Sequence, residues 1–375
     1  MIIKRVALMQ DHLASIAVFS YWLVILYFYV IGLPGHVLEW LSLFFSTPAF
    51  LMVFFKKKTE KESREFTKQL TLLLVLIILG WISSSHNQNS TYTGYAFMIL
   101  GNAGIALFMY YYNISQKVSI ILFLILSMLL IKYYIAYGNF TYIFSISRNY
   151  VSVFLLCFFT ILCVFCSERR KTLNIFALMV LLFSCMAGGR GGILASVILN
   201  LFCFGITMRY DTGYDKVYYI LGSLLAGILL MFVLQFRDWT ETVHFFIGKF
   251  AYTGFGVDSD RISLYTPYIQ ECGTFENLLF GTNIKSILDT HLHNTYLMAH
   301  ARFGIIGLCI FIVLFTRAVI YSWKTGNKML AALILTIMVR IFTDSVFTIT
   351  SFDSIFFYIL FLGLNSYTRG IKQYA

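Results

Sequence analysis

The chain has 375 residues, 59% of them hydrophobic and 12% charged, and its mean hydropathy is +0.79. Soluble domains do not carry this much apolar sequence, so the composition excludes the soluble classes and predicts an integral membrane protein. A net charge of +11 would favour nucleic-acid binding in a soluble protein. In a membrane protein it reflects topology, and we expect no nucleic-acid partner.

The apolar runs predict an all-α, polytopic protein with about twelve membrane-spanning helices, when they are compared with the roughly 20 residues that cross a bilayer. The expected spans are 12–33, 37–55, 69–85, 95–112, 118–137, 150–166, 172–188, 193–208, 217–236, 294–316, 329–348 and 352–368. We expect residues 1–375 to form a single transmembrane domain with both termini on one side. The first run is too long for a cleavable signal peptide.

Lysine and arginine are distributed unevenly between the connecting segments. With the N-terminus in the cytoplasm, the inner segments hold 19 Lys and Arg and the outer segments hold six. Cytoplasmic segments are enriched in these residues, so this orientation is predicted. The six outer residues are Arg148, Arg190, Arg237, Lys249, Arg261 and Lys285.

One large hydrophilic loop, residues 237–293, is expected on the outer side between the ninth and tenth helices. Within it, the acidic run 258–260 is expected to cap a short helix that begins near Arg261. Pro267 would interrupt or kink this helix, because proline lacks the backbone N–H that helical hydrogen bonding needs.

The loop ends in a polar stretch, residues 290–297 (THLHNTYL), where a long apolar run begins. A helix starting there would have Asn294 as its capping side chain, and its free N–H groups would attract a phosphate. If the helix includes His293, then His293, Tyr296 and His300 share one face. The alternative is an ordinary interfacial helix start, which is often polar and aromatic.

A second polar feature is the glycine turn at residues 188–192 (GGRGG), between two short apolar runs. Four glycines predict a helix break, since each costs on the order of 1 kcal/mol in a helix relative to alanine. Bare backbone lets a phosphate approach N–H groups closely, and Arg190 adds a positive charge on the outer side. We favour an anion site over a plain hairpin turn whose arginine snorkels to water.

Three further charged residues are candidates. Arg261 binds either an anion or the acidic run beside it as a surface ion pair. Arg340 and Asp344 are four residues apart in the eleventh expected span, so we expect them to compensate each other or a partner helix. Asp344 lies nearer the outer end, where it could orient a histidine.

No Walker loop, zinc signature or dinucleotide fingerprint occurs, so we expect neither a metal nor a cofactor. The outer side offers cations and a possible base instead: Arg190, Arg261, His291 and His293. Such a set suits a substrate that bears phosphates and a reaction that removes a proton from a hydroxyl.

The histidine stretch resembles a known signature. His293-Asn294, nine residues, and then Gly304-x-x-Gly307 is similar to the His-Asn-x9-Gly-x-x-Gly motif of the O-antigen ligase and polymerase superfamily. These are membrane glycosyltransferases of bacterial polysaccharide and lipopolysaccharide biosynthesis. The resemblance covers about residues 170–350.

Three other elements extend this resemblance. Arg190 is similar to the family's Ser-Arg-Gly element, with Gly189 in place of the usual Ser or Thr. Residues 260–265 (DRISLY) resemble the second arginine element and are followed by Leu-Phe-Gly at 279–281. Asp344 falls where the family often carries an acidic residue.

The resemblance implies an inverting, metal-independent glycosyl transfer on the outer, periplasmic face of the bacterial inner membrane. The donor would be an oligosaccharide on undecaprenyl pyrophosphate, with Arg190 and Arg261 stabilising the pyrophosphate leaving group. His293 would be the general base for the acceptor hydroxyl. The supporting residues would be Asn294, Asp344, His291 and Tyr296.

The family contains polymerases, which extend a glycan on its lipid carrier, and ligases, which transfer the finished glycan to a lipid A core. The motifs do not separate the two; we favour a polymerase because capsule and O-antigen clusters supply more such chains. A lipid-linked oligosaccharide flippase is the competing class. A transporter needs a midplane site, often with broken helices and internal symmetry, whereas the polar groups here gather on one side.

Overall fold

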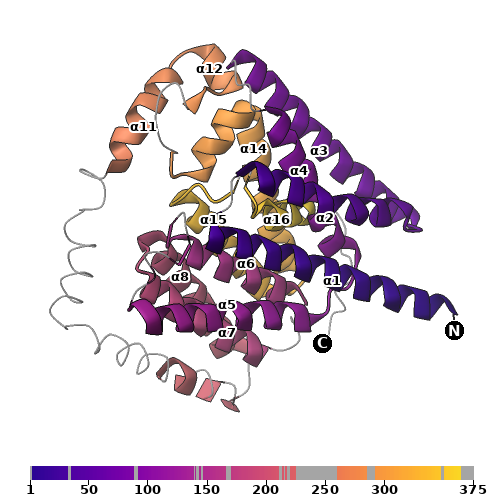
Figure 1. Ribbon diagram of the computed structural model, residues 1–375, viewed down its shortest axis with the longest axis vertical. Helices are drawn as coiled ribbons and strands as arrows, with labels where there is room; N and C mark the ends of the chain where they lie inside the picture. The colour runs from indigo at the N-terminus through magenta and orange to yellow at the C-terminus, as the bar shows by residue number, and fades with distance from the viewer. Residues whose placement is uncertain are drawn as a thin grey trace.

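The computed structural model describes residues 2–32, 35–87, 92–138, 140, 143–144, 147–165, 170–210, 213–214, 216–217, 220–224, 260–284, 292–347 and 350–364. This part of the chain consists of helices and loops, with no β-strand. The helices are α1 Ile2–Ile31, α2 Gly35–Phe55, α3 Glu60–His86, α4 Tyr92–Tyr111, α5 Gln116–Tyr137, α6 Tyr150–Phe165, α7 Arg170–Ala187, α8 Arg190–Tyr210, α11 Asp260–Glu271, α12 Phe275–Phe280, α14 Thr295–Lys324, α15 Lys328–Phe342 and α16 Asp353–Leu364 (Figure 1).

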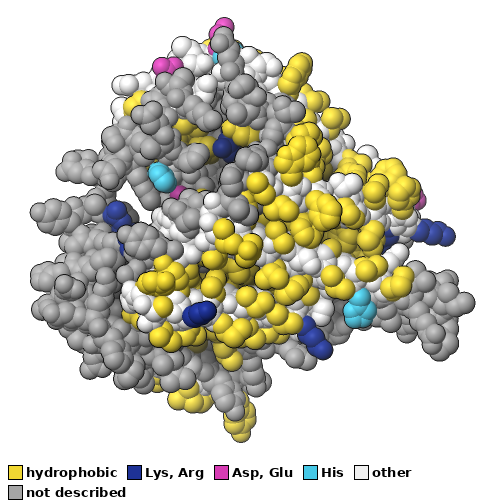
Figure 2. All heavy atoms as spheres, viewed as in Figure 1, with side chains coloured by type: hydrophobic (Ala, Val, Ile, Leu, Met, Phe, Trp, Pro, Cys, Tyr) yellow, Lys and Arg dark blue, Asp and Glu magenta, His cyan; other side chains and the backbone are white. Residues whose placement is uncertain are grey.

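Five of these helices are long and apolar enough to cross a membrane: α1, α3, α5, α8 and α14. Five others, α2, α4, α6, α7 and α16, contain shorter apolar stretches. Large hydrophobic side chains are exposed on the outside, including Phe44, Phe55 and Ile135. Figure 2 shows hydrophobic side chains spread over one face of the molecule. A membrane-embedded, all-helical protein is the class that fits these features.

The expected spans coincide with described helices except for one. The ninth, 217–236, falls largely outside the described residues, as does much of the expected loop 237–293. The twelve-span count therefore stays a prediction. The described part of that loop is helical, because it contains α11 and α12.

The bundle has two ends with different chemistry. At one end, which we call the lysine end, Lys56 between α2 and α3 donates a hydrogen bond to the carbonyl oxygen of Tyr111, at the end of α4. At the other end, which we call the histidine end, Arg340 near the end of α15 binds Ser152 at the start of α6. These contacts place alternate connections at opposite ends, as expected for a chain that crosses the bundle repeatedly.

Small residues allow two early helices to pack closely. A Cβ atom added at Gly101 or Gly104 of α4 would lie 2.8 Å or 2.7 Å from the Cβ atoms of Ser42 and Ser46 on α2. These distances are shorter than a van der Waals contact, so alanine does not fit. Close approach through small residues is a common way for membrane helices to associate.

Helix α14 contacts α3, α12, α15 and α16 (Figure 1). It is kinked at Gly304, whose φ of 67° and ψ of −174° are not helical. Only glycine fits at this kink, because a Cβ atom at Gly304 would collide with the carbonyl oxygen of Leu279. The same holds on the opposite segment, where a Cβ atom at Gly281 would collide with the carbonyl oxygen of His300. The Leu-Phe-Gly and Gly-x-x-Gly elements therefore interlock through their backbones.

The segment of α11 and α12, which we call the cap, is fastened to the start of α14. Tyr268 of α11 is buried and its hydroxyl lies 2.6 Å from Nδ1 of His300. Nε2 of His300 donates to the carbonyl oxygen of Leu278 at 2.8 Å, so Nδ1 is the acceptor for Tyr268. Of the two expected effects of Pro267, interruption of the helix does not occur, because α11 continues through it to Glu271. The anchored Tyr268, directly after the proline, holds that part of the helix in place.

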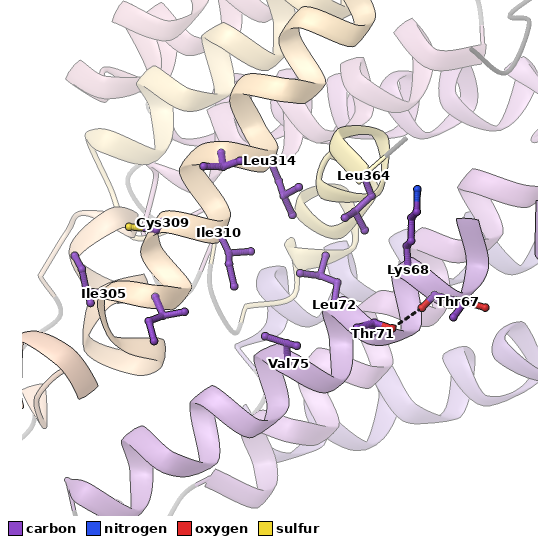
Figure 3. A pocket seen from close by; sticks show the side chains of 12 residues that line it. Thr67, Lys68, Thr71, Leu72, Val75, Ile305, Cys309, Ile310, Leu314 and Leu364 are labelled. Carbon is purple, nitrogen blue, oxygen red and sulfur yellow. Dashed lines mark hydrogen bonds between the residues drawn. The ribbon is translucent and has the colours of Figure 1, made fainter. Parts of the chain in front are cut away.

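An apolar groove of about 680 Å³ runs between α3 and α14. Figure 3 shows Thr67 and Lys68 at one end and Ile305 at the other, with Leu72 and Leu314 between them. The groove shares no lining residue with the polar cavity described below. Its lining is predominantly apolar and suits hydrocarbon chains.

Candidate active site

His293 lies immediately before α14 and outside the helix. Asn294 is the N-cap, as expected, and its side-chain oxygen accepts hydrogen bonds from the backbone N–H groups of Tyr296 and Leu297 at 2.9 Å and 3.2 Å. Because the helix begins at Thr295, the expected helical face shared by His293, Tyr296 and His300 does not exist.

The backbone of His293 is unusual. Its φ of 47° makes it the sole non-glycine residue with positive φ in the described part of the chain. Left-handed backbone costs an L-residue free energy, of order 1–3 kcal/mol, and residues held this way concentrate at functional sites. The conformation turns the histidine away from the helix axis and toward the loop that follows α15.

His293 meets Asp344 in that loop. Its Nδ1 lies 3.2 Å from Oδ1 of Asp344, which also accepts a hydrogen bond from the backbone N–H of Ser345 at 2.9 Å. A carboxylate beside Nδ1 selects the tautomer that carries the proton there, so Nε2 keeps its lone pair. The histidine side chain is 47% exposed and the aspartate 14% exposed. The arrangement therefore presents a free imidazole nitrogen to solvent or to a substrate.

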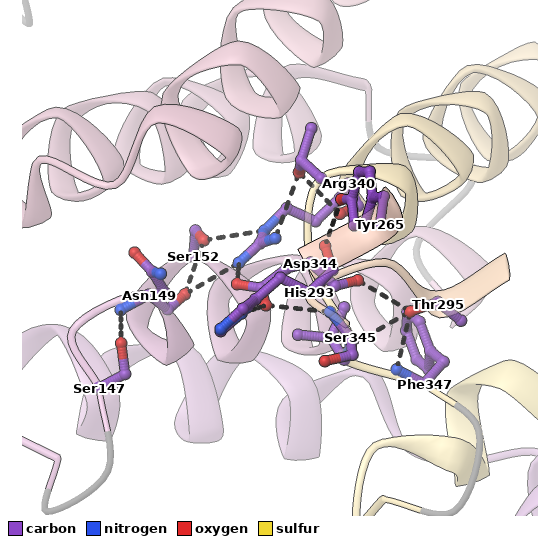
Figure 4. Close-up of polar contacts among 12 residues, drawn as sticks. Ser147, Asn149, Ser152, Tyr265, His293, Thr295, Arg340, Asp344, Ser345 and Phe347 are labelled. Atoms are coloured by element: carbon purple, nitrogen blue, oxygen red, sulfur yellow. Dashed lines mark hydrogen bonds and ion pairs between the residues drawn. The ribbon is translucent and has the colours of Figure 1, made fainter. Parts of the chain in front are cut away.

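Asp344 is held from its other side by Arg340. Nη2 of Arg340 lies 3.3 Å from Oδ2 of Asp344, and the arginine side chain is only 3% exposed. Nη2 also donates to the carbonyl oxygen of Asn149, and Nε donates to Oγ of Ser152. Figure 4 shows the guanidinium of Arg340 between Asp344 and the start of α6, where Asn149 and Ser152 lie. A buried arginine thus links three segments and fixes the carboxylate.

These neighbours change the acidity of Asp344, which lies beyond the end of α15. Burial alone would raise its pKa. The hydrogen bond from His293 and the charge of Arg340 outweigh burial and lower the pKa below its ordinary value. Asp344 is therefore ionised at neutral pH and can stabilise a positive charge on the imidazole.

Thr295 fixes the loop that carries the aspartate. Its Oγ1 donates to the carbonyl oxygen of Asp344 at 2.9 Å and accepts from the backbone N–H of Val346 at 3.2 Å. The hydrogen bond joins the first turn of α14 to the loop after α15, and Figure 4 shows it beside the His293–Asp344 pair. The histidine and its carboxylate are thus attached to the same local framework.

A polar cavity of about 230 Å³ is lined by Asp344 but not by His293, which lies on the other side of the carboxylate from Arg340. Its lining comes from the turn before α6, the glycine turn between α7 and α8, and the end of α15. The lining residues are Arg148, Asn149, Gly188, Gly189, Arg190, Gly191, Arg340, Thr343 and Asp344. With three arginines and one carboxylate, the cavity has an excess of positive charge and suits an anion.

The glycine turn serves mainly close packing. Gly188, with φ of 66°, ends α7 in the left-handed conformation that glycine tolerates. A Cβ atom at Gly189 would lie 2.6 Å from Oδ1 of Asn149, and one at Gly191 would collide with Thr343. The break between the two helices is as expected, and the glycines bring the start of α8 against α6 and α15. This packing places Arg190, the first residue of α8, on the cavity wall.

The other expected site residues divide into two groups. Tyr296 donates to the carbonyl oxygen of Met338 at 3.3 Å, and its ring lies tilted against that of Phe342, so it joins α14 to α15 and does not line the cavity. His291 lies outside the described residues. Arg261 is in the first turn of α11, and its side chain also lies outside the described part.

Sequence reasoning did not find the contribution of the turn before α6. Arg148, Asn149 and Ser152 reach the site although they are about 40 residues from Arg190 and about 190 from Arg340. The one signal was that Arg148 is among the few basic residues expected on the outer side. Within the described residues, His, Cys, Asp and Glu do not form a cluster of three or more.

A scan against protein-family models finds no match to this chain, and a search of curated proteins finds none either.

Proposed function

We propose that this protein is a membrane glycosyltransferase that polymerises a bacterial surface polysaccharide. The observation that carries the proposal is the His293–Asp344 pair at the edge of an arginine-lined cavity. An oriented imidazole is suited to accept a proton from a sugar hydroxyl, and the cavity is suited to hold a diphosphate. The resemblance of the histidine and arginine motifs to the O-antigen ligase and polymerase superfamily supports the same reaction.

In the proposed reaction, the acceptor hydroxyl oxygen attacks the anomeric carbon of an oligosaccharide on undecaprenyl pyrophosphate. The bond from that carbon to the pyrophosphate oxygen breaks, and the hydroxyl proton passes to Nε2 of His293. Asp344, which lies beside Nδ1, stabilises the imidazolium that results through its negative charge. Arg190 stabilises the negative charge on the departing pyrophosphate. The anomeric configuration inverts because a single displacement occurs.

The distribution of basic residues supports a site on the outer face of the bacterial inner membrane. The lysine end of the bundle holds Lys56 in a run of three lysines, whereas Arg148 and Arg190 stand at the histidine end. Cytoplasmic segments are enriched in Lys and Arg, so the cavity is assigned to the periplasmic side. The arginines of the cavity then depart from the enrichment of Lys and Arg on the cytoplasmic side, and binding of an anionic substrate accounts for this departure.

A ligase that transfers the glycan to a lipid A core would use the same base and the same leaving-group site. The two differ in the acceptor alone. The polymerase is proposed first because capsule and O-antigen clusters supply more such chains.

The test is complementation of cells that lack their own polymerase with the wild-type chain or with His293→Ala. We expect wild-type chains to restore long glycans on gels and His293→Ala to abolish them, with equal membrane abundance on blots. Normal glycan lengths from His293→Ala would overturn the proposal. Accumulation of lipid-linked units on the cytoplasmic face would instead identify a flippase, and a glycan restored only on a lipid A core would identify a ligase.

A further inference from the structure

Arg148 is the one arginine of the cavity to which neither the sequence nor the proposed mechanism assigns a role. It lies half-buried in the turn before α6. No described residue forms a hydrogen bond or ion pair with its guanidinium, whereas Arg340 on the same cavity wall has four such contacts. Arginine keeps its charge in every protein environment, so this positive charge lacks a counter-charge within the described structure.

The turn that carries Arg148 is held rigidly. The backbone N–H of Tyr150 donates to the carbonyl oxygen of Ser147 at 3.1 Å, and the N–H of Val151 donates to that of Arg148 at 3.1 Å. The next carbonyl, of Asn149, accepts from Arg340, as Figure 4 shows. A guanidinium on a pre-organised turn loses little entropy when it binds an anion.

Two helix ends add to the positive potential. The turn with Arg148 leads directly into α6, and the glycine turn leads directly into α8, so the cavity lies at the N-terminal ends of both helices. The first N–H groups of a helix lack helical partners, and each N-terminus carries roughly half a positive charge. The arginines and the two helix ends therefore act on the same small volume.

We infer that Arg148 binds the diphosphate group of the lipid-linked donor, which lies in the cavity between the turn at 147–149 and the turn at 188–191. This inference rests on the proposed function and adds to it a second described cation beside Arg190. A volume of about 230 Å³ is below the roughly 300–1,000 Å³ typical of drug-sized ligand sites, so it fits a charged headgroup better than an oligosaccharide. The attached sugar then extends past Asp344 toward His293.

Direct binding tests the inference without any need for glycosyl transfer. The full-length protein in lipid nanodiscs is titrated calorimetrically with inorganic pyrophosphate, inorganic phosphate and farnesyl pyrophosphate. We expect Arg148→Ala to weaken binding of both diphosphates about 10-fold to 100-fold, as expected for loss of charge-assisted hydrogen bonds. Arg317→Ala, which removes an exposed arginine from α14, should change binding less than twofold.

Arg148→Lys is the second variant and guards against a folding defect. It keeps the charge but lacks the planar fork that binds phosphate in two places, so its affinity should fall between those of the wild type and Arg148→Ala. Equal affinity of Arg148→Ala and the wild type for both diphosphates would overturn the inference. So would inorganic phosphate binding as tightly as pyrophosphate. If Arg148→Ala loses affinity for farnesyl pyrophosphate but not for inorganic pyrophosphate, the inference holds for a diphosphate that is attached to a lipid.

The outcome for Arg148 is separable from the proposed function. His293→Ala should bind pyrophosphate like the wild type even though it makes no polymer. If the wild type binds pyrophosphate through Arg148 but never forms polymer, the diphosphate site stands and the polymerase proposal fails. If polymer forms and Arg148→Ala changes neither rate nor binding, the polymerase proposal stands and the role of Arg148 fails.

Discussion

His293 and His300 are seven residues apart at the start of one helix, yet their surroundings are opposite. His293 has half its side chain exposed and its Nδ1 beside a carboxylate. His300 is 5% exposed, and both ring nitrogens are engaged, one by the Tyr268 hydroxyl and one by the Leu278 carbonyl oxygen. The hydrogen-bond partners of each histidine decide its role. A histidine with one free nitrogen and an anion behind it suits proton transfer, whereas one with both nitrogens engaged in a closed site fastens the cap.

The largest effect on the His293 side of this comparison, after removal of the histidine itself, should come from Asp344→Asn. We expect the polymerisation rate per folded molecule to fall about 10²-fold, because the amide cannot stabilise an imidazolium by charge. The variant also leaves buried Arg340 without its anion, so the folded fraction is measured by size-exclusion chromatography and used to normalise the rate.

The matched control for that variant is Glu60→Gln, which makes the same carboxylate-to-amide change in an exposed surface pair with Arg64 at the lysine end. It should alter the rate less than twofold. An Asp344→Asn rate as high as that of the control would remove Asp344 from the mechanism.

On the His300 side, Gly304→Ala should have the largest effect. The new Cβ would collide with the Leu279 carbonyl oxygen and require a left-handed alanine, so we expect a loss of about 3 kcal/mol in unfolding free energy. Gly205→Ala, at a position in α8 with open space around it, should instead be neutral or slightly stabilising. Thermal unfolding in detergent measures both. Equal melting temperatures would show that the interlock contributes nothing.

His300→Leu should cost about 2 kcal/mol, because it leaves the Leu278 carbonyl oxygen without its partner and leaves the Tyr268 hydroxyl with only the Leu297 carbonyl oxygen. The polymerisation rate of the folded fraction should stay within tenfold of the wild type. A catalytic loss as large as that of His293→Ala, with unchanged stability, would exchange the roles of the two histidines.

The smallest effect is expected for Tyr296→Phe, between the two histidines. Its hydroxyl makes one hydrogen bond of 3.3 Å to the Met338 carbonyl oxygen, so the unfolding free energy should fall by about 0.5 kcal/mol. The rate should be unchanged, since the ring faces α15. A tenfold loss of rate at full stability would return Tyr296 to the site.

Local chemistry in the sequence predicted some features of this region well. Asn294 caps α14 because a cap depends on residues within one turn. Gly188 and Gly189 separate α7 from α8 for equally local reasons, whereas Gly191 and Gly192 lie in the first turn of α8. The left-handed backbone of His293 was not predictable, because the hydrogen bond to Asp344 and the capped helix hold it in place.

Other features depend on contacts between distant segments. Pro267 normally ends a helix, but Tyr268 is anchored on α14 and the helix persists. Arg148 meets the glycine turn only after α6 and α8 have packed together, and no periodicity in the sequence encodes that meeting. Composition and hydropathy predicted a helical membrane protein, while the partners of each charged residue required the tertiary structure.

The meeting of Gly281 and Gly304 also limits how this chain can diverge. A side chain at either position would displace a backbone carbonyl of the other segment, so neither glycine can be replaced unless the opposite segment is rebuilt. Among descendants of this sequence, the two glycines should persist or disappear as a pair. A search pattern that requires both glycines, 23 positions apart, should therefore distinguish relatives from unrelated chains better than a pattern that requires only one of them.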